Sequence, residues 1–493
     1  MKTAKLAGVV LALGLATSAC RKHDDAAQRG PLQPCRLPGI EEELMCGKLT
    51  VPENRQTRVG RTIDLNVVVL PALDGKTTDA PLFDLAGGPG ASSIAGASFY
   101  AQEGREFRRG RDVVLLDQRG TGESNPLAAA PRLKSPQDFL TEMYPTAYVE
   151  TLRSALEKKA DLTQYTTSIA MDDLDDVRAW LGYERINLFG LSYGTRAALV
   201  YMRQHPERVR SAVLMGVAPT NLKMPLHHAR AANRAMDLLL DDCAGDAKCR
   251  EAFPEIRRES EAVVARLETE PARVSYAMPD GSGSVTVEIR ADIFAEKLRS
   301  RMYSPGGARQ LPLVIHHAAQ GNFEPFLQLA IPKDRARPDF IADGMYLSVT
   351  CAEDTPFIDQ AEAARANAGN PFGSYRVLQQ SRACSMWPRG TLPAGYQDAV
   401  NSDIPALLIS GNMDPVTPPE FAEEVGRHLS NSRHVVIPQH AHVPDGLINA
   451  ECLDKLMLQF YATADAKNLD TACLAEVRAP PFATELEELG AQR

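Results

Sequence analysis

The sequence predicts an α/β protein in which a mostly parallel sheet is flanked by helices and interrupted by a large helical insertion. Short apolar runs that end in turn residues recur near both ends of the chain, at residues 81–88, 112–120, 186–190, 209–216, 404–411 and 433–438. Such runs are typical of strands that are buried on both faces of a parallel sheet. From about residue 218 to 395 the pattern changes to long, charged amphipathic helices, with one hairpin at residues 280–289.

The size and charge of the chain limit its class. It has 493 residues, of which 44% are hydrophobic, enough for one large domain with an insertion or for two domains. Its formal net charge is −9, and it has no sustained block of Lys and Arg. Because nucleic-acid binding depends on positive charge, we expect no nucleic-acid partner.

The first twenty residues have the pattern of a secretory signal peptide. Two lysines are followed by an apolar run at residues 6–16, three small residues and Cys20. The run is shorter than the ~20 residues of a membrane-spanning helix. A cysteine directly after small residues resembles the processing site of bacterial lipoproteins, which predicts lipidation of Cys20; ordinary signal cleavage nearby is the alternative. We therefore expect a protein of the bacterial cell envelope, periplasmic or held at a membrane only through that lipid, with residues 21–43 as a tether.

The remaining cysteines predict disulfide bonds. Eight are left after Cys20, and an even number in an exported chain favours disulfides over metal binding. About 105 connectivities are possible, and short loop closure favours pairing between neighbours. The pairs on this hypothesis are Cys35–Cys46, Cys243–Cys249, Cys351–Cys384 and Cys452–Cys473. No Cys-x-x-Cys motif occurs, and we expect neither a metal site nor a cofactor.

The stretch "NLFGLSYGT" places a serine between a predicted strand and a predicted helix. Gly190 and Gly194 lie two residues on either side of Ser192. Strand, G-x-S-x-G and helix form the nucleophile elbow, in which a strained turn exposes the serine hydroxyl. A side chain at either glycine would strike the neighbouring strand or helix. The alternative is an ordinary glycine-rich loop, but the strand and helix around it favour Ser192 as a nucleophile.

A nucleophilic serine needs an orienting acid and a base, and both are expected after later strands. Asp414 follows the strand at residues 404–411 and precedes a helix near Thr417, which already provides a cap for that helix. The next strand is followed by His440 and His442, of which only one can act as the base. The order Ser192, Asp414, His442 agrees with the chain order of the triad in elbow-containing hydrolases.

A glycine-rich loop after the strand at residues 81–88 predicts an oxyanion hole. It contains Gly87, Gly88, Pro89 and Gly90, but lacks the Gly-Lys-Ser/Thr of a phosphate-binding loop. We expect the backbone N–H groups of Gly88 and Tyr193 to bind the developing negative charge. Each such donor typically lowers the barrier by ~3 kcal/mol.

Taken as an ordered set, these motifs identify a family. "LAGGPG", "LLDQRGTGES", "NLFGLSYGT", "SGNMDPVTPP" and the terminal His…Cys…Cys segment resemble α/β-hydrolases of the prolyl iminopeptidase and secreted tripeptidyl-aminopeptidase kind, from about residue 44 to 476. The resemblance implies an α/β-hydrolase core at residues 44–217 and 396–476 and a helical cap domain at 218–395. It places His442 at the position of the base, with His440 as a rival because Ala441 and Val443 replace the usual glycines. Asp117 and Arg119 are expected to brace the loop beside the site.

The resemblance also implies an activity. Members of this family release amino acids or short peptides from peptide N-termini through a serine acyl-enzyme, so the expected partner is a peptide with a free N-terminus. Its α-ammonium group needs a negative countercharge, for which Glu353 and Asp354 are candidates; a solvated acidic turn is the alternative. The alternative function is a capped esterase that acts on small acyl esters or amides. A binding protein on an inactive hydrolase fold is disfavoured because every catalytic position is filled.

Overall fold

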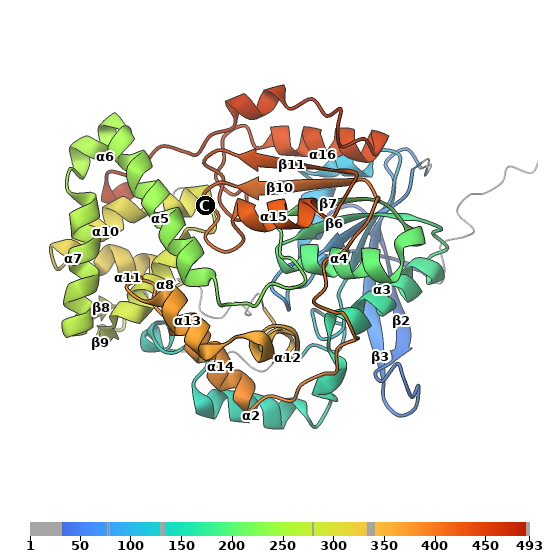
Figure 1. Cartoon of the computed structure of the whole chain (residues 1–493), viewed down its shortest axis with the longest axis horizontal. Helices are drawn as coiled ribbons and strands as arrows, with labels where there is room; N and C mark the ends of the chain where they lie inside the picture. The colour runs from blue at the N-terminus through green and yellow to red at the C-terminus, as the bar shows by residue number, and fades with distance from the viewer. Residues whose placement is uncertain are drawn as a thin grey trace, which may run out of the picture.

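The computed structural model describes residues 32–489 except 76, 78, 129–132, 134, 279–280 and 333–340. The predicted signal peptide, Cys20 and the first part of the predicted tether lie outside the described residues. A nine-stranded sheet lies in one half of the described part of the molecule, on the right in Figure 1, beside the helices of the insertion. Its strands are β1 (Gln33–Cys35), β2 (Leu44–Pro52), β3 (Thr62–Leu70), β4 (Leu82–Leu85), β5 (Val113–Leu116), β6 (Ile186–Leu191), β7 (Val209–Met215), β10 (Ala406–Gly411) and β11 (Ser432–Ile437).

The sheet is mostly parallel, as the sequence predicts. Its strand order is β1-β2-β3-β5-β4-β6-β7-β10-β11. The six strands from β5 to β11 run parallel to one another, whereas β1, β2 and β3 join antiparallel at one edge. The carboxyl ends of β4, β6, β7, β10 and β11 therefore meet at one edge, where the connecting loops can form a site.

The central strands are apolar throughout because the protein covers both faces of the sheet. In β5, Val114 and Leu116 pack into the core on one face, while Val113 and Leu115 pack into the core on the other. All four are buried. Because successive side chains of a strand point to opposite faces of the sheet, a continuous apolar run contributes to a hydrophobic core on each face.

Helices cover both faces of the sheet. The helices and 3₁₀ turns outside the insertion are η2 (Ile94–Gly96), α1 (Ala97–Ala101), η3 (Arg105–Arg108), η4 (Pro136–Leu140), α2 (Thr146–Leu156), η5 (Leu162–Gln164), α3 (Thr167–Trp180), α4 (Tyr193–Gln204), η6 (Pro206–Arg208), α15 (Pro419–Gly426), α16 (Glu451–Thr463), η8 (Ala472–Glu476) and η9 (Leu486–Glu488). Residues of α3, α4 and α15 pack against one face. Residues of α1 and α16 pack against the other.

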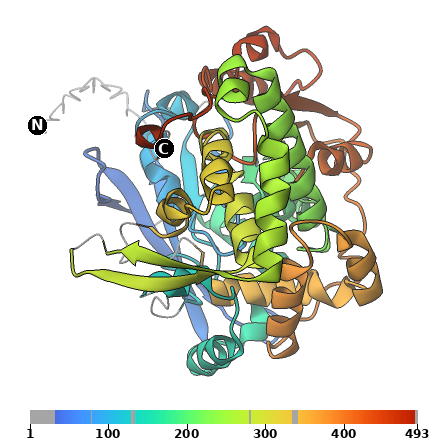
Figure 2. The same ribbon diagram turned by 90° about the vertical axis from the view of Figure 1, so that its left-hand side faces the viewer.

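The insertion forms a cap with its own hydrophobic core. Its elements are α5 (His228–Gly245), α6 (Ala247–Ala252), α7 (Ile256–Thr269), β8 (Ala272–Ala277), β9 (Ser284–Ile289), α8 (Ala291–Arg301), α9 (Pro305–Ala308), α10 (Leu311–Ala319), α11 (Glu324–Ala330), α12 (Asp343–Glu353), η7 (Thr355–Phe357), α13 (Gln360–Asn367) and α14 (Tyr375–Ser385). The predicted hairpin is β8–β9, which projects from the side of the cap (Figure 2). Helices α5 to α8, α10 and α11 supply most of the apolar residues in the cap core.

The boundaries between cap, core and tether differ from the predicted ones. Within the predicted cap, α12 and α14 pack into the core that covers the sheet. Conversely, residues 139–140 and 482–483, which lie outside the predicted cap, belong to the cap core. Residues 33–35 were expected in the tether but form β1, because they pair with residues 44–46 of β2. The C-terminal part of the insertion therefore packs with the core, and segments outside the insertion complete the core of the cap.

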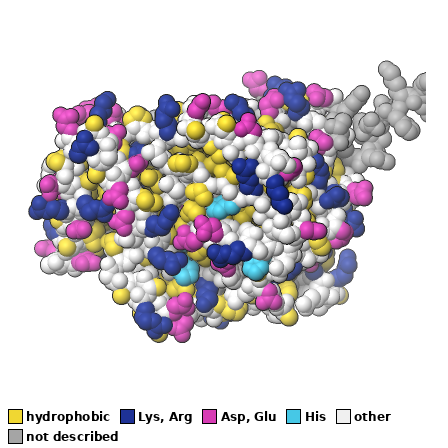
Figure 3. All heavy atoms as spheres, turned by 45° about the horizontal axis from the view of Figure 1, so that its top comes forward, with side chains coloured by type: hydrophobic (Ala, Val, Ile, Leu, Met, Phe, Trp, Pro, Cys, Tyr) yellow, Lys and Arg dark blue, Asp and Glu magenta, His cyan; other side chains and the backbone are white. Residues whose placement is uncertain are grey.

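Four disulfides confirm the pairing hypothesis. They are Cys35–Cys46, Cys243–Cys249, Cys351–Cys384 and Cys452–Cys473. Such bonds form and persist in oxidising compartments, so they indicate an exported protein. Among the described residues, no helix is long and apolar enough to cross a membrane. Positive and negative side chains are interspersed over the face shown in Figure 3.

Candidate active site

Ser192 occupies a strained turn between β6 and α4. Its backbone angles are φ 58° and ψ −123°, a combination that L-residues rarely adopt. A Cβ atom on Gly194 would lie 1.9 Å from the carbonyl oxygen of Leu85, and one on Gly190 would lie 2.5 Å from the carbonyl oxygen of Gly194. Only glycine fits at either position, which is the steric reason expected from the sequence. The turn has the geometry of a nucleophile elbow.

The glycine-rich loop after β4 lies directly beside Ser192. A Cβ atom on Gly87 would lie 3.2 Å from Cβ of Ser192 and 3.8 Å from its Oγ. The next residue, Gly88, has a φ of 111°, a value that residues other than glycine avoid. The N–H of Tyr193 belongs to the first residue of α4, and an N–H in the first turn of a helix has no acceptor within that helix. Of the two predicted oxyanion donors, Tyr193 directly follows the serine in the chain, and Gly88 follows the glycine that lies beside the serine in space.

Asp414 and His442 form a buried pair at the ends of β10 and β11. Nδ1 of His442 lies 2.7 Å from Oδ2 of Asp414. The other oxygen, Oδ1, accepts the backbone N–H groups of Val416 and Thr417, each at 2.8 Å. The Thr417 hydroxyl donates to Oδ2 at 2.8 Å. Thr417 was expected to cap the following helix; instead Pro418 precedes that helix, and Thr417 holds the aspartate.

These donors keep Asp414 ionised although it is fully buried. Burial opposes its charge, but the His442 imidazole and the N–H groups of Thr417 and Val416 together hold the pKa of the Asp414 carboxyl below its ordinary value. An ionised carboxylate at Nδ1 fixes the tautomer of the imidazole and leaves Nε2 to face the other way.

Of the two candidate histidines, His442 is the one that contacts Asp414. His440 is also buried, and neither of its ring nitrogens has a hydrogen-bond partner among the described residues. Burial lowers the pKa of His440 to about 4, so this side chain is neutral at working pH. Its backbone carbonyl accepts the N–H of Met413, which ties the histidine loop to the end of β10.

The end of β7 connects the serine to the histidine. The N–H of Ser192 donates to the carbonyl of Met215 at 2.9 Å. The next residue, Gly216, has a φ of 64°, and a Cβ atom there would lie 3.2 Å from Cε1 of His442. The His442 imidazole thus packs on the backbone of Gly216, one residue after the end of β7, the strand whose last carbonyl accepts the Ser192 N–H. Ser192 and the Asp414–His442 pair therefore both lie at the end of β7, on the edge of the sheet where the parallel strands end.

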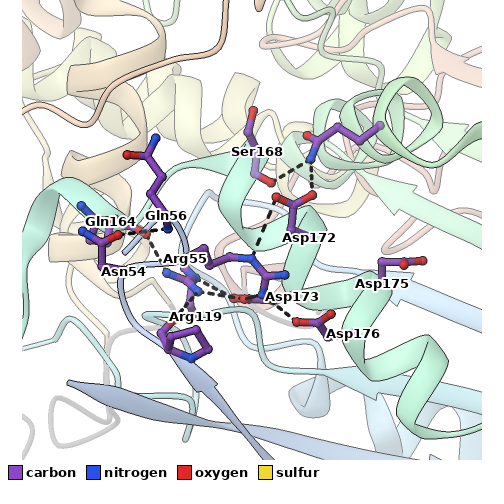
Figure 4. Close-up of polar contacts among 12 residues, drawn as sticks. Asn54, Arg55, Gln56, Arg119, Gln164, Ser168, Asp172, Asp173, Asp175 and Asp176 are labelled. Atoms are coloured by element: carbon purple, nitrogen blue, oxygen red, sulfur yellow. Dashed lines mark hydrogen bonds and ion pairs between the residues drawn. The ribbon is translucent and has the colours of Figure 1, made fainter. Parts of the chain in front are cut away.

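The "DQRGTGES" segment braces this edge, as the sequence analysis expects. Oδ1 of Asp117 accepts the Ser92 hydroxyl at 2.5 Å, just beyond the glycine-rich loop. Arg119 is fully buried and donates to Asp173 of α3 at 2.6 and 2.8 Å. Figure 4 shows Arg119 and Arg55 converging on the same aspartate. The segment therefore anchors the loop and α3 to the sheet.

The structure contradicts the prediction that Glu353 and Asp354 bind substrate. Both side chains have 0% exposure, so no water-sized group reaches either carboxylate. Glu353 accepts the N–H and the hydroxyl of Thr167, each at 2.7 Å, at the start of α3. Asp354 accepts Nη2 of Arg196 at 2.9 Å. The alternative of a solvated turn is also wrong, because the pair is an internal anchor between α12, α3 and α4.

Burial and crowding explain how this anchor differs from Asp414. Glu353 and Asp354 share one cation, the fully buried Arg196 of α4. Burial raises the pKa of both carboxyls above their ordinary values, and one guanidinium only partly offsets this effect. The role of Arg196 could not be predicted from the sequence, because Arg196 lies 158 residues from Asp354 and belongs to no motif for ion pairing.

Comparison with known proteins identifies the family. Residues 81–248 match a family model described as alpha/beta hydrolase fold, and residues 369–473 match one described as TAP-like protein. The serine protease Hip1 of Mycobacterium tuberculosis is 24% identical over 433 residues, which cover 81% of this chain and 82% of that one. The tripeptidyl aminopeptidase of Streptomyces coelicolor is 22% identical over 477 residues, 88% of this chain and 84% of that one. The chain is a serine hydrolase with the α/β-hydrolase fold.

Other relatives of the hydrolase are of the same type. A probable proline iminopeptidase of Streptomyces coelicolor is 33% identical over 144 residues, 29% of this chain and 35% of that one. The relatives named here are serine proteases and aminopeptidases, so the family resemblance predicted from the motifs is confirmed. The solved structure of the proline iminopeptidase of Mycobacterium smegmatis matches with a TM-score of 0.40 and 17% identity, over 85% of this chain and 99% of that one.

We predict that Glu353→Ala destabilises the hydrolase by about 2–4 kcal/mol, because it leaves the Thr167 and Tyr396 donors buried without an acceptor. Glu362→Ala is the control, since among the described residues the Glu362 side chain forms only a partly exposed ion pair, with Lys223, and its loss should cost less than about 1 kcal/mol. Guanidinium unfolding measures both variants. Equal stability of the two would show that the Glu353 anchor contributes nothing to the fold.

Proposed function

We propose that this hydrolase is an aminopeptidase that releases short peptides or single residues from peptide N-termini, with Ser192, His442 and Asp414 as its catalytic triad. The observation that carries the proposal is the buried Asp414–His442 pair, 2.7 Å apart, beside a serine in a strained elbow. The names of the relatives support the choice of peptides as substrates.

The geometry supports the following course of reaction. Oγ of Ser192 attacks the scissile carbonyl carbon while Nε2 of His442 takes the hydroxyl proton. The carbonyl oxygen becomes an oxyanion, which accepts hydrogen bonds from the N–H groups of Gly88 and Tyr193. The C–N bond breaks, and His442 gives its proton to the departing amine. Water then attacks the acyl-enzyme by the same route, which releases the N-terminal fragment and restores Ser192.

Asp414 acts through the imidazole rather than on the substrate. During each attack His442 becomes an imidazolium, and the adjacent carboxylate stabilises that charge. The three donors on Asp414 hold this carboxylate in place and ionised. The countercharge for the substrate α-ammonium is not Glu353 or Asp354, because neither carboxylate is exposed.

We predict that His442→Gln lowers kcat by at least about a thousandfold, because the triad acts as one unit. His440→Gln is the matched control: it replaces a neighbouring buried imidazole that makes no hydrogen bond among the described residues, so kcat should stay within about fivefold. Steady-state rates on a chromogenic peptide amide test both variants. A reversed order of effects would make His440 the base.

A second prediction separates a peptidase from an esterase. If the site binds a free α-ammonium group, acetylation removes a charge-assisted contact that contributes about 1.5–3 kcal/mol, so kcat/KM should fall about tenfold to a hundredfold. The assay compares aminoacyl, dipeptidyl and tripeptidyl chromogenic amides, each with a free and an acetylated terminus, with short acyl esters. Equal rates on both termini, or faster turnover of simple esters, would favour the capped esterase.

We also propose that the mature hydrolase is a lipoprotein of the bacterial envelope, with lipid on Cys20. A single acyl chain binds a membrane only marginally, so stable anchoring requires more than one chain. Mass spectrometry of the mature N-terminus should show a peptide that begins at Cys20 and carries acyl groups. An unmodified N-terminus, or one that begins at another residue, would disprove the lipid anchor but would not bear on the proposed activity.

A further inference from the structure

Tyr303 joins the cap to the loop that carries His442. It lies two residues after α8, in the turn that leads to α9. Its backbone carbonyl accepts the N–H of His442 at 2.9 Å and that of Val443 at 2.8 Å. Its ring meets the imidazole edge to face, with centroids 5.0 Å apart and planes at 77°. The cap therefore contacts both the backbone and the side chain of His442.

The same turn contacts the histidine loop a second time. The N–H of Gly306 donates to the carbonyl of Asp445 at 3.2 Å. Gly446 has a φ of 87°, and a Cβ atom there would lie 2.8 Å from the backbone of Gly306. Two stretches of backbone, residues 303–306 and 442–446, thus meet too closely for a side chain to separate them.

The Tyr303 side chain is itself held by buried charges of the cap. Nη1 of Arg299 donates to the Tyr303 hydroxyl at 3.1 Å, and the guanidinium lies 5.3 Å from the centre of the ring. Glu296 holds Arg299 through two hydrogen bonds of 2.9 and 2.6 Å. Arg376 of α14 lies 3.5 Å from the same carboxylate. A chain of contacts therefore leads from α14 and α8 through Tyr303 to His442.

The other supports of the imidazole come from the core. Asp414 and Thr417 both contact Nδ1, and the backbone of Gly216 packs near Cε1. A bond at Nδ1 fixes which nitrogen faces the acid, but it leaves the ring free to tilt about that bond. An aromatic ring packed against the imidazole resists this tilt. Displacement by 1 Å can reduce a rate about a hundredfold, so the restraint matters for catalysis.

We propose that Tyr303 is a positioning residue, which holds the His442 imidazole in the orientation that proton transfer from Ser192 requires and makes this orientation depend on the cap. The inference rests on the proposed role of His442 as the base. It assigns the cap a part in the chemical step, in addition to any part in selecting substrates.

The test compares Tyr303→Leu, which removes the ring, with Tyr303→Phe, which removes only the hydroxyl. Tyr303→Leu should lower kcat about tenfold to a hundredfold with KM within about threefold, since the acid–base step is impaired and binding is not. Tyr303→Phe should retain kcat within about fivefold, because the ring remains. Tyr276→Leu, a partly buried tyrosine of β8, is the control and should leave both constants unchanged.

Two further measurements separate positioning from other roles. Titration of active sites with a small fluorophosphonate gives the folded, reactive fraction, and rates are expressed per titrated site. The rate constant of phosphonylation should fall in parallel with kcat, because this small reagent needs the base but no peptide subsite. A rise in KM with normal phosphonylation would make Tyr303 a substrate contact only, and normal rates per titrated site would make it structural only; either result overturns the proposal.

The remaining outcomes are also decisive. If Tyr303→Leu does not fold, Tyr303→Met replaces it, with the same expected loss of kcat. Phosphonylation does not depend on a free N-terminus, so it tests Tyr303 even if the enzyme proves to be an esterase. Normal phosphonylation of His442→Gln would instead disprove the triad, which distinguishes failure of the proposed function from failure of this inference.

Discussion

The backbone around Ser192 is packed too closely for any residue but glycine at positions 190 and 194, and the rest of the site is built on this constraint. Gly194 touches the end of β4, so the glycine-rich loop that leaves β4 must start beside the elbow. The backbone N–H of Ser192 donates to the carbonyl of Met215 at the end of β7, and the following residue, Gly216, packs against the imidazole of His442. Because each of these contacts is made by backbone at the end of a strand, the relative positions of Ser192, the glycine-rich loop and His442 follow from the sheet itself.

The second constraint is electrostatic, and it separates the buried carboxylates by role. Asp414 has three donors of its own and an adjacent imidazole, so it remains a usable anion in a dry environment. Glu353 accepts hydrogen bonds from Thr167 and Tyr396 and shares the Arg196 guanidinium with Asp354, one oxygen of which has no partner among the described residues. Burial nevertheless raises the pKa of both carboxyls above the ordinary values. Burying these two carboxylates costs free energy. In return they anchor the start of α3, through Glu353, and helix α4, which follows Ser192, through Asp354.

The features that could be predicted from sequence are those that depend on short stretches or on chain order. The apolar strands, the elbow and the order Ser192, Asp414, His442 need no knowledge of distant partners. The predictions that proved wrong concern the surroundings of individual side chains, which depend on residues far away in the chain. Glu353 and Asp354 looked like surface acids because their partner Arg196 lies far away in the chain, and Thr417 looked like a helix cap because its contact with His442 spans 25 residues. Tyr303 carries no motif at all, since its strongest contacts are made by a backbone carbonyl.

These long-range contacts limit how far the cap can move relative to the core of this enzyme. An insertion with its own core could in principle move as a separate lid over a complete active site. Here α12 and α14 pack on the sheet, Glu353 and Asp354 of the insertion hold α3 and α4, and the turn at Tyr303 holds the loop of His442. Each contact ties an element of the core to a residue of the insertion. Helix α5 is tied to the core in the same way, because Arg234 donates to the carbonyl of Asn412 and Asp242 accepts a hydrogen bond from Gln439. Large movement of these parts of the cap would therefore break hydrogen bonds to the loops that carry Asp414 and His442.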